Sequence, residues 1–337
     1  MSNDVENVTP ARIHDFAWGM ARTATLVTAL DLDLFTAISR GADTVDALQK
    51  NTGASRRGLS GLLTALEASE LLERSAEAYK LPPDVEKYLV RDSREYLGDM
   101  RHIHRELNFR IWPQLTDAVK EGTPRTEIFA TSADEVWSQI TPYMDALAAG
   151  SGRWIAKVAE DVIPKQPRIF DAGCGYGGCG RSLIERWGGS VHGIDRESSV
   201  TLAREFAASA NLADRAEYQA GDLFEQDWGG PYDVVLLSNI LHGYSPDRAQ
   251  ELLARSVSAL RDSSSVIILN EIVPDDTETD PVGAFFSLQM LMTSEGYAHD
   301  LAAYHSWLNE VGFTTRRELR SPTGPGTLVV ATKDGVK

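Results

Sequence analysis

Residues 171–180 form a glycine-rich stretch that follows a short apolar run and precedes a helical pattern. Gly173 and Gly175 lack a Cβ atom, so the chain can turn tightly there and a ligand can lie against the backbone. The amides at the start of the following helix are free to donate to a carboxylate or a phosphate. Asp171 adds a negative charge beside the loop, which disfavours a pyrophosphate and suits an ammonium group. The stretch therefore predicts a ligand with an amino acid moiety.

Two more carboxylates follow the next two predicted strands. Asp195 ends the second strand, 20 residues after Gly175, where an acidic side chain can bind ribose hydroxyls. Asp222 follows the third strand, where it can meet the amino group of an adenine beside Phe224. Ser238 ends the fourth strand and is assigned to the same site. Acids at three successive strand ends predict S-adenosylmethionine as the cofactor, with S-adenosylhomocysteine as its product.

His242 lies just past the fourth predicted strand, on the edge of the sheet where ligands bind in such folds. A histidine, whose ordinary pKa is about 6.5, can remove a proton from a phenol or a similar hydroxyl. Methyl transfer from a sulfonium is an in-line displacement, so the enzyme mainly aligns the nucleophile with the methyl group. We predict that His242 is the general base of such a transfer.

These positions require an alternation of strands and helices, which begins at Arg168. Apolar, β-rich runs predict strands over 168–170, 190–194, 216–219, 234–238, 265–270 and 327–332. Helices are predicted over 181–187, 198–209, 248–260 and 307–311. This order is typical of a Rossmann-like α/β fold with a doubly wound, mostly parallel sheet.

The chain before this sheet is predicted to be helical. Residues 11–40 carry more apolar positions at helical spacing than one solvated helix needs, so the segment sits in a core or meets a partner chain. Residues 43–90 predict three helices and then a hairpin that turns at 75–78, with Thr44 and Ser55 as helix caps. This order suits a winged helix, and long helices are predicted over 95–160.

The charge of the chain argues against several function classes. The net charge is −16, which repels a phosphate backbone, and the winged helix offers only the basic pair Arg56–Arg57, so no nucleic-acid partner is predicted. The N-terminus lacks a signal pattern and no apolar run reaches transmembrane length. Cys174 and Cys179 are predicted to be reduced thiols of a cytoplasmic protein without a membrane partner.

Together these motifs resemble the class I S-adenosylmethionine-dependent O-methyltransferase family, which includes plant caffeic acid and flavonoid enzymes and bacterial polyketide tailoring enzymes. The resemblance spans nearly the whole chain and rests on 171–175, Asp195, 222–224 and 240–247. It implies that Glu271, at the end of the fifth predicted strand, orients His242. It also implies a homodimer and a small, aromatic or polyketide-like secondary metabolite as acceptor.

The resemblance further implies three regions. Residues 1–95 are expected to form a helical, winged-helix-containing dimerisation domain. Residues 96–160 are expected to supply connecting helices that roof the substrate pocket. Residues 161–337 are expected to form the Rossmann-like methyltransferase domain. The predicted substrate-binding side chains are those of His102, Phe109, Trp112, Met144, Met290 and Thr293.

Two positions depart from the family pattern. An Asp-Trp pair usually follows the histidine, where this chain has Gly243-Tyr244. A second acid of the plant enzymes corresponds to Ala298, beside His299, which we add to the catalytic candidates. His242 with His299 or His305 and a carboxylate would form a facial site for a divalent metal or iron. Two alternatives therefore stay open: metal-assisted C-methylation of a 2-oxo acid, and a cofactor-binding relative that no longer methylates.

Overall fold

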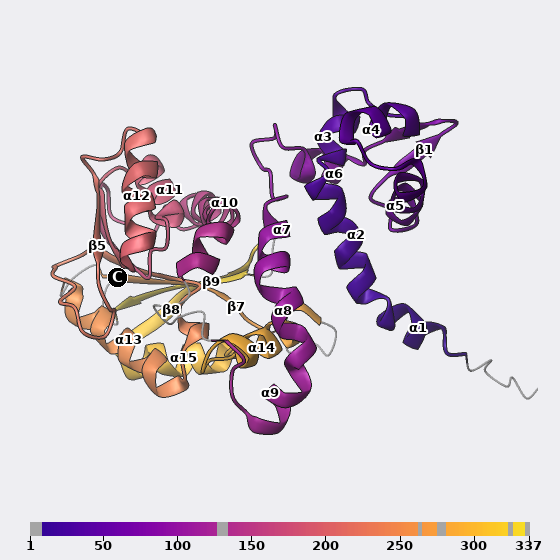
Figure 1. Ribbon diagram of the computed structural model, residues 1–337. Helices are drawn as coiled ribbons and strands as arrows, with labels where there is room; N and C mark the ends of the chain where they lie inside the picture. The colour runs from indigo at the N-terminus through magenta and orange to yellow at the C-terminus, as the bar shows by residue number, and fades with distance from the viewer. Residues whose placement is uncertain (1–8, 127–133, 262–264, 275–280, 323–325, 334–337) are drawn as a thin grey trace, which may run out of the picture. The chain divides into compact units, whose positions relative to one another are not determined.

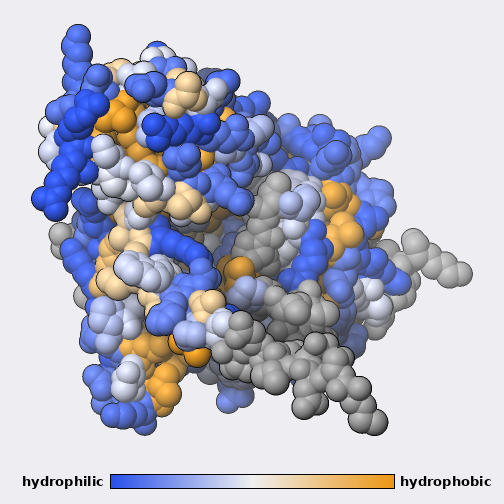
Figure 2. Space-filling view, turned by 90° about the vertical axis from the view of Figure 1, so that its right-hand side faces the viewer, coloured by the Kyte–Doolittle hydropathy of each residue, from blue (hydrophilic) through white to orange (hydrophobic). Residues whose placement is uncertain are grey.

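The computed structural model describes residues 9–126, 134–261, 265–274, 281–322 and 326–333. The chain divides into two compact units, Met1–Asn108 and Phe109–Lys337. The finer division at residues 95 and 160 stays a prediction. Within the described residues, no helix combines the length and the apolar character that crossing a bilayer requires. Figure 2 shows one face of the molecule, on which hydrophilic residues predominate and hydrophobic ones form small patches.

The first unit is helical and carries one hairpin (Figure 1). Its elements are α1 (Ala11–Ala17), α2 (Gly19–Asp31), α3 (Leu34–Ser39), α4 (Val45–Thr52), α5 (Arg56–Ala68), β1 (Glu73–Ser75), β2 (Ala78–Lys80), α6 (Pro83–Leu89), α7 (Met100–Ile103) and the π-helical turn η1 (His104–Asn108). The Thr44 side chain accepts a hydrogen bond from the backbone amide of Ala47 at 3.2 Å, and the Ser55 side chain accepts one from the amide of Gly58 at 3.1 Å. Both caps and the hairpin are confirmed, but the third helix, α6, follows the hairpin instead of preceding it.

The apolar segment 11–40 forms three helices, and Asp33, in a left-handed conformation with φ 51°, separates α2 from α3. Its second half packs into the core of the first unit, where Leu30, Leu34 and Phe35 are buried with Leu59 and Leu63 of α5. The prediction of a core segment is therefore confirmed for this half.

The second unit contains a seven-stranded sheet with the order β5-β4-β3-β6-β7-β9-β8. The strands are β3 (Arg168–Ala172), β4 (Ser190–Asp195), β5 (Ala216–Ala220), β6 (Val234–Ser238), β7 (Val266–Ile272), β8 (Phe313–Arg320) and β9 (Gly326–Lys333). The first five pair in parallel, whereas β9 pairs antiparallel with both β7 and β8. This is the predicted doubly wound, mostly parallel sheet, and its order reverses between β3 and β6, where ligands bind in such folds.

Helices cover both faces of this sheet (Figure 1). The helical elements of the unit are α8 (Phe109–Ile111), η2 (Trp112–Gln114), α9 (Leu115–Glu121), α10 (Asp134–Val158), α11 (Gly178–Trp187), α12 (Glu197–Ser209), η4 (Leu241–Gly243), α13 (Pro246–Ala259), α14 (Pro281–Thr293) and α15 (Leu301–Glu310). The α10, α11 and α12 helices lie on one face, and α13 and α15 on the other.

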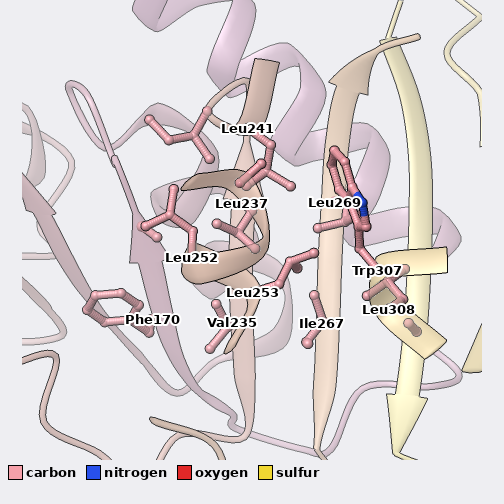
Figure 3. Packing of buried hydrophobic residues seen from close by; sticks show 14 of the residues in the cluster. Phe170, Val235, Leu237, Leu241, Leu252, Leu253, Ile267, Leu269, Trp307 and Leu308 are labelled. Atoms are coloured by element: carbon pink, nitrogen blue, oxygen red, sulfur yellow. The ribbon is translucent and has the colours of Figure 1, made fainter. Parts of the chain in front are cut away.

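Adjacent residues of the central strands point to opposite faces, as the period of a strand requires. Ile169 belongs to the core under α10 to α12, and its neighbour Phe170 to the core under α13 and α15. In the second core, Leu237 and Leu269 of the sheet pack with Trp307 (Figure 3). Because both faces are buried, these strands are mostly apolar, and their positions are predicted within two residues at each end.

Two predictions for this unit need correction. Only 327–332 was expected as a final strand, whereas β8 precedes it; its residues are mostly polar and exposed, so no apolar pattern marks it. Between 109 and 121 the expected long helix consists of short pieces, because Pro113 cannot donate a backbone hydrogen bond within a helix. Gly122, with φ 66°, then ends α9.

Candidate active site

The glycine-rich loop connects β3 to α11 at the carboxyl end of the sheet. Gly173, Gly175 and Gly177 have φ values of 67°, 55° and 76°, which L side chains rarely adopt. The amide of Gly173 donates to the carbonyl of Ile194 at 3.0 Å, and a Cβ atom at Gly173 would collide with Ile240. A Cβ atom at Gly175 would meet no protein atom within 4 Å. The loop therefore leaves open space at Gly175, as a cofactor lying on its backbone requires.

Asp195 joins the end of β4 to this loop. Its Oδ2 accepts a hydrogen bond from the Gly175 amide at 2.8 Å, and its Oδ1 accepts one from the Arg196 amide at 2.8 Å. Burial raises the pKa of Asp195, and these amides oppose the rise. Each carboxylate oxygen has a second lone pair, so Asp195 can still accept ribose hydroxyls beside Gly175.

Asp171 lies beneath the loop, and its side chain is 2% exposed. Burial raises the pKa of Asp171 to about 7, while the Gly180 amide and the Arg181 guanidinium oppose the rise. A Cβ atom at Gly180 would lie 2.7 Å from Asp171 Oδ2. The carboxyl thus faces the first turn of α11, and direct contact with a cofactor ammonium stays a prediction.

Asp222 and Phe224 follow β5, as predicted. The exposed Asp222 accepts the Phe224 amide at 2.7 Å. The Phe224 ring meets the Tyr244 ring edge-on at 5.1 Å, and the Arg248 guanidinium lies 3.8 Å from the centroid of Phe224. Burial raises the pKa of Tyr244 to about 12, and the charges of Asp222 and Asp195 add to this. Tyr244 therefore lies near two of the three predicted cofactor acids, a role that its sequence position alone did not assign.

Ser238 ends β6, at the point where the strand order reverses. Its hydroxyl accepts a hydrogen bond from the side-chain amide of Asn270 at 2.9 Å. The two cysteines of the loop are buried free thiols, as predicted. Burial raises the pKa of Cys174 and Cys179, which disfavours the thiolate form.

His242 and Glu271 form a buried pair beside this loop. His242 lies in η4, directly after β6, and Glu271 is the penultimate residue of β7. His242 Nδ1 is 2.6 Å from Glu271 Oε2, and the two residues are 6% and 1% exposed. Glu271 Oε1 accepts the amides of Ile240 and Leu241 at 2.9 Å each. The pairing expected from the family resemblance is therefore present in the structure.

His299 occupies a different environment. Its Nε2 donates to the carbonyl of Tyr244 at 3.1 Å, and its ring is 1% exposed. Burial lowers the pKa of His299. His305 is not brought to His242, because it pairs with Glu318 at 2.9 Å and with Thr315. Within the described ranges, no three His, Cys, Asp or Glu side chains are grouped to hold a metal ion, so the facial metal site has no support.

The predicted substrate residues of the second unit gather partly around α14. Trp112 Nε1 donates to Gln289 Oε1 at 3.0 Å, and Phe286, one turn earlier on α14, meets the His242 ring edge-on at 4.7 Å. Met290 and Thr293 of the same helix are buried. Sequence reasoning missed Phe286 and Gln289, because α14 is apolar around its circumference and its pattern does not indicate which face meets the site.

The other substrate candidates are less closely connected to His242. Met144 on α10 and Phe109 on α8 are half-buried. His102 belongs to the first unit, where burial and the neighbouring Arg101 lower its pKa. The assignment of these three residues to the acceptor pocket stays a prediction.

A profile of the O-methyltransferase domain family matches residues 112–314, which include the loop, all three acids and the His242–Glu271 pair. The chain belongs to this O-methyltransferase family. It is accordingly an S-adenosylmethionine-dependent methyltransferase, and it carries the predicted Rossmann-like fold.

Relatives of this methyltransferase align along most of its length. A curated relative, the 3-hydroxy-5-methyl-1-naphthoate 3-O-methyltransferase of Streptomyces sahachiroi, is 29% identical and covers 97% of this chain and 95% of its own. A solved structure described as a candidate O-methyltransferase of Nostoc punctiforme has a TM-score of 0.86 and 29% identity, covering 97% of this chain and 100% of its own. Human N-acetylserotonin methyltransferase, solved with S-adenosylmethionine, has a TM-score of 0.82 and 22% identity, covering 98% and 99%.

Proposed function

We propose that this protein methylates a hydroxyl group of a small aromatic secondary metabolite, with His242 as the general base. The observation that carries the proposal is the buried hydrogen bond between His242 Nδ1 and Glu271 Oε2. A carboxylate at Nδ1 holds the proton on that nitrogen, so that the second ring nitrogen, Nε2, is left basic. The carboxylate also stabilises the imidazolium that forms when Nε2 takes a proton.

In this mechanism His242 Nε2 takes the proton of the acceptor hydroxyl while that oxygen attacks the methyl carbon. When bound, the cofactor would supply a sulfonium methyl group to this oxygen, so that S-adenosylhomocysteine is the leaving group and the methyl ether is the product. The residues that would hold the cofactor are Asp195 at the ribose, Asp222 with Phe224 and Tyr244 at the adenine, and the backbone around Gly175. The carboxylates of Asp195 and Asp222 complement the positive charge of the cofactor, and Asp171 adds to them when it is ionised.

An aromatic acceptor is supported by the side chains around His242. Phe286 of α14 lies against the His242 ring. Gln289, one turn after Phe286 on the same helix, accepts a hydrogen bond from Trp112. These groups offer apolar faces and neutral polar atoms, which suits a phenol-like molecule. The curated relative named above is a methyltransferase of a hydroxynaphthoate, a molecule of this class.

The test is methyl transfer from isotopically labelled S-adenosylmethionine to a panel of hydroxynaphthoates and other phenols. His242→Gln is expected to lower kcat by about 100-fold or more, since a general base contributes about 10²–10⁴. Affinity for S-adenosylhomocysteine, measured by calorimetry, should stay near the wild-type value. His305→Gln is the matched control, because His305 pairs with Glu318 outside the site. A His242→Gln protein as fast as wild type, or a product methylated on carbon, would refute the proposal.

We also infer that the protein is a homodimer that associates through its N-terminal helices. Ile13, Phe16, Trp18 and Met20, on and between α1 and α2, are 66–73% exposed, although all four are large and apolar. Such a cluster typically marks an interface. Phe16→Glu combined with Trp18→Glu should yield a monomer in analytical ultracentrifugation, whereas Val119→Glu, at an apolar residue of α9 that is 60% exposed, should not. A wild-type monomer at micromolar concentration would contradict the inference.

A further inference from the structure

We propose that His299 is a positioning residue, which holds the carbonyl of Tyr244 and thereby fixes the η4 turn that carries His242. The proposal rests on the proposed function, in which His242 is the general base. It replaces the expectation from sequence that His299 takes part in the chemistry itself.

The η4 turn is held at both of its ends by buried side chains. Before it, the amides of Ile240 and Leu241 donate to Glu271 Oε1 at 2.9 Å each. After it, the carbonyl of Tyr244 accepts His299 Nε2–H at 3.1 Å. His242 therefore lies between two fixed points that come from different elements, β7 and the segment that follows α14. A general base needs such fixation, because small displacements from the reacting oxygen cost large factors in rate.

The imidazole of His299 is itself immobilised. It is 1% exposed, and the rings of Tyr297, Trp307 and Tyr304 surround it with centroids at 4.4, 5.0 and 5.9 Å, each in edge-on geometry. Burial lowers the pKa of His299, while its hydrogen bonds to the backbone of Tyr244 and Leu241 oppose this shift. Because a carbonyl can only accept, the contact with Tyr244 places a proton on Nε2. With Nε2–H used by a backbone carbonyl, the ring serves to hold the chain rather than to exchange protons with a substrate.

The segment before His299 packs closely against the backbone of the η4 turn. A Cβ atom at Gly296 would collide with the carbonyl oxygen of His242 and lie 2.7 Å from the amide nitrogen of Tyr244. The Gly296 amide donates to Ser294 Oγ at 3.1 Å, and that hydroxyl donates to the carbonyl of Met290 at 3.2 Å. The end of α14 is thus linked, residue by residue, to the backbone that carries the base.

Loss of the hydrogen bond should affect kcat more than cofactor binding. The Tyr244 ring packs against Phe224 and Arg248. Within the part of the chain that the structure describes, no hydrogen bond or ring contact joins these two residues to His299. The position of His242, by contrast, depends on Glu271 at one end of the turn and on His299 at the other. We therefore expect the rate of methyl transfer to fall while affinity for S-adenosylhomocysteine stays within about threefold of wild type.

The experiment compares His299→Phe with His299→Gln in the full-length protein. Phe fills the space among the aromatic rings but cannot donate, whereas the amide of Gln can replace Nε2–H. His299→Phe should lower kcat by about 10-fold or more, as expected for a lost buried hydrogen bond. His299→Gln should restore kcat to within about threefold of wild type, and both variants should keep the ascending limb of the pH–rate profile at its wild-type midpoint. His305→Gln is the control for loss of a half-buried histidine that is paired with Glu318.

A readout independent of activity is the Cε1–H signal of His242 in NMR spectra of histidine-labelled protein, assigned with His242→Gln. The signal should broaden or shift in His299→Phe and keep its wild-type position in His299→Gln. Wild-type kcat together with an unchanged His242 signal in His299→Phe would overturn the proposal. Equal inactivity of both variants, with loss of the ascending limb, would overturn it in favour of a catalytic His299. A wild-type protein that methylates no hydroxyl would refute the proposed function, while the NMR comparison would still decide whether His299 holds the turn.

Discussion

Glu271 binds both the side chain of His242 and the backbone that leads to it. One carboxylate oxygen lies 2.6 Å from His242 Nδ1, and the other accepts the amides of Ile240 and Leu241 at 2.9 Å each. The same side chain therefore orients the imidazole and fixes the start of its turn, although 29 residues separate the two in sequence.

This double role makes Glu271→Gln a severe change. A glutamine has one oxygen acceptor instead of two, so it cannot accept both from the backbone amides and from Nδ1–H, and it carries no charge to stabilise an imidazolium. We expect kcat to fall by about 100-fold with a small change in KM, measured by single-turnover methyl transfer. Glu318→Gln, which breaks the more exposed His305–Glu318 pair, is the matched control and should leave kcat unchanged. Comparable rates for both variants would mean that Glu271 has no catalytic role.

Much of the sheet and of the cofactor side of the site could be predicted from the sequence. The central strands are buried on both faces, so each is a mostly apolar run, and parallel strands bring their carboxyl ends to one edge. Asp195 ends β4, Asp222 follows the edge strand β5 and His242 follows β6, so their shared location is a consequence of topology alone. The tight turn expected at Gly173 and Gly175 is present, and both residues have a positive φ, which glycine adopts without strain.

The remaining features depend on contacts that no local pattern encodes. His299 is held by Tyr244, 55 residues away, and Phe286 reaches His242 from a helix that is apolar on all sides. Asp171 was predicted as an acid beside the loop, but its burial against the first turn of α11 depends on how that helix packs. The His242–Glu271 pairing was expected only through the family resemblance, since spacing alone does not indicate it.

The burial of Asp171 predicts an unusual pH dependence of stability. Its pKa is about 7 in the folded protein and about 4 in an unfolded chain, so the folded state binds the proton more tightly. Stability contributed by this group is fully present below about pH 4 and is lost as the pH rises to about 7. We compare the Tm of Asp171→Asn with that of wild type by scanning calorimetry without cofactor. The difference, variant minus wild type, should rise from pH 5 to pH 7 and level off above pH 7. A difference independent of pH would show that the carboxyl is not perturbed.

Gly175→Ala should separate cofactor binding from stability. A methyl group there meets no protein atom within 4 Å but imposes a left-handed conformation on alanine, which costs about 1–2 kcal/mol. Gly53→Ala, at the end of α4, has the same open surroundings and a φ of 70°, so it is a matched control for the backbone strain. Both variants should lose similar stability, but only Gly175→Ala should lose affinity for S-adenosylhomocysteine, by about 10-fold or more in calorimetry. Equal affinity in the two variants would place the cofactor elsewhere.

Arg181 and Asp145 form an ion pair that joins α11 to α10. Arg181 Nη2 lies 3.0 Å from both carboxylate oxygens of Asp145, and the side chains are 9% and 19% exposed. Arg181 also donates to the carbonyl of Tyr176 in the glycine-rich loop. Removal of one partner of a buried pair leaves the other charge uncompensated, at a cost of about 3–5 kcal/mol.

Arg181→Met should therefore lower the Tm by about 6–12 °C at pH 8. Burial already raises the pKa of Asp145, and loss of the guanidinium removes the main opposing charge. Asp145 in the variant is then protonated more readily, so the loss of Tm should shrink as the pH falls toward 5. Arg186→Met is the control, because its pair with Glu160 is about half exposed and should contribute at most about 1 kcal/mol. Equal Tm losses in the two variants, or a loss independent of pH, would contradict the buried-pair interpretation.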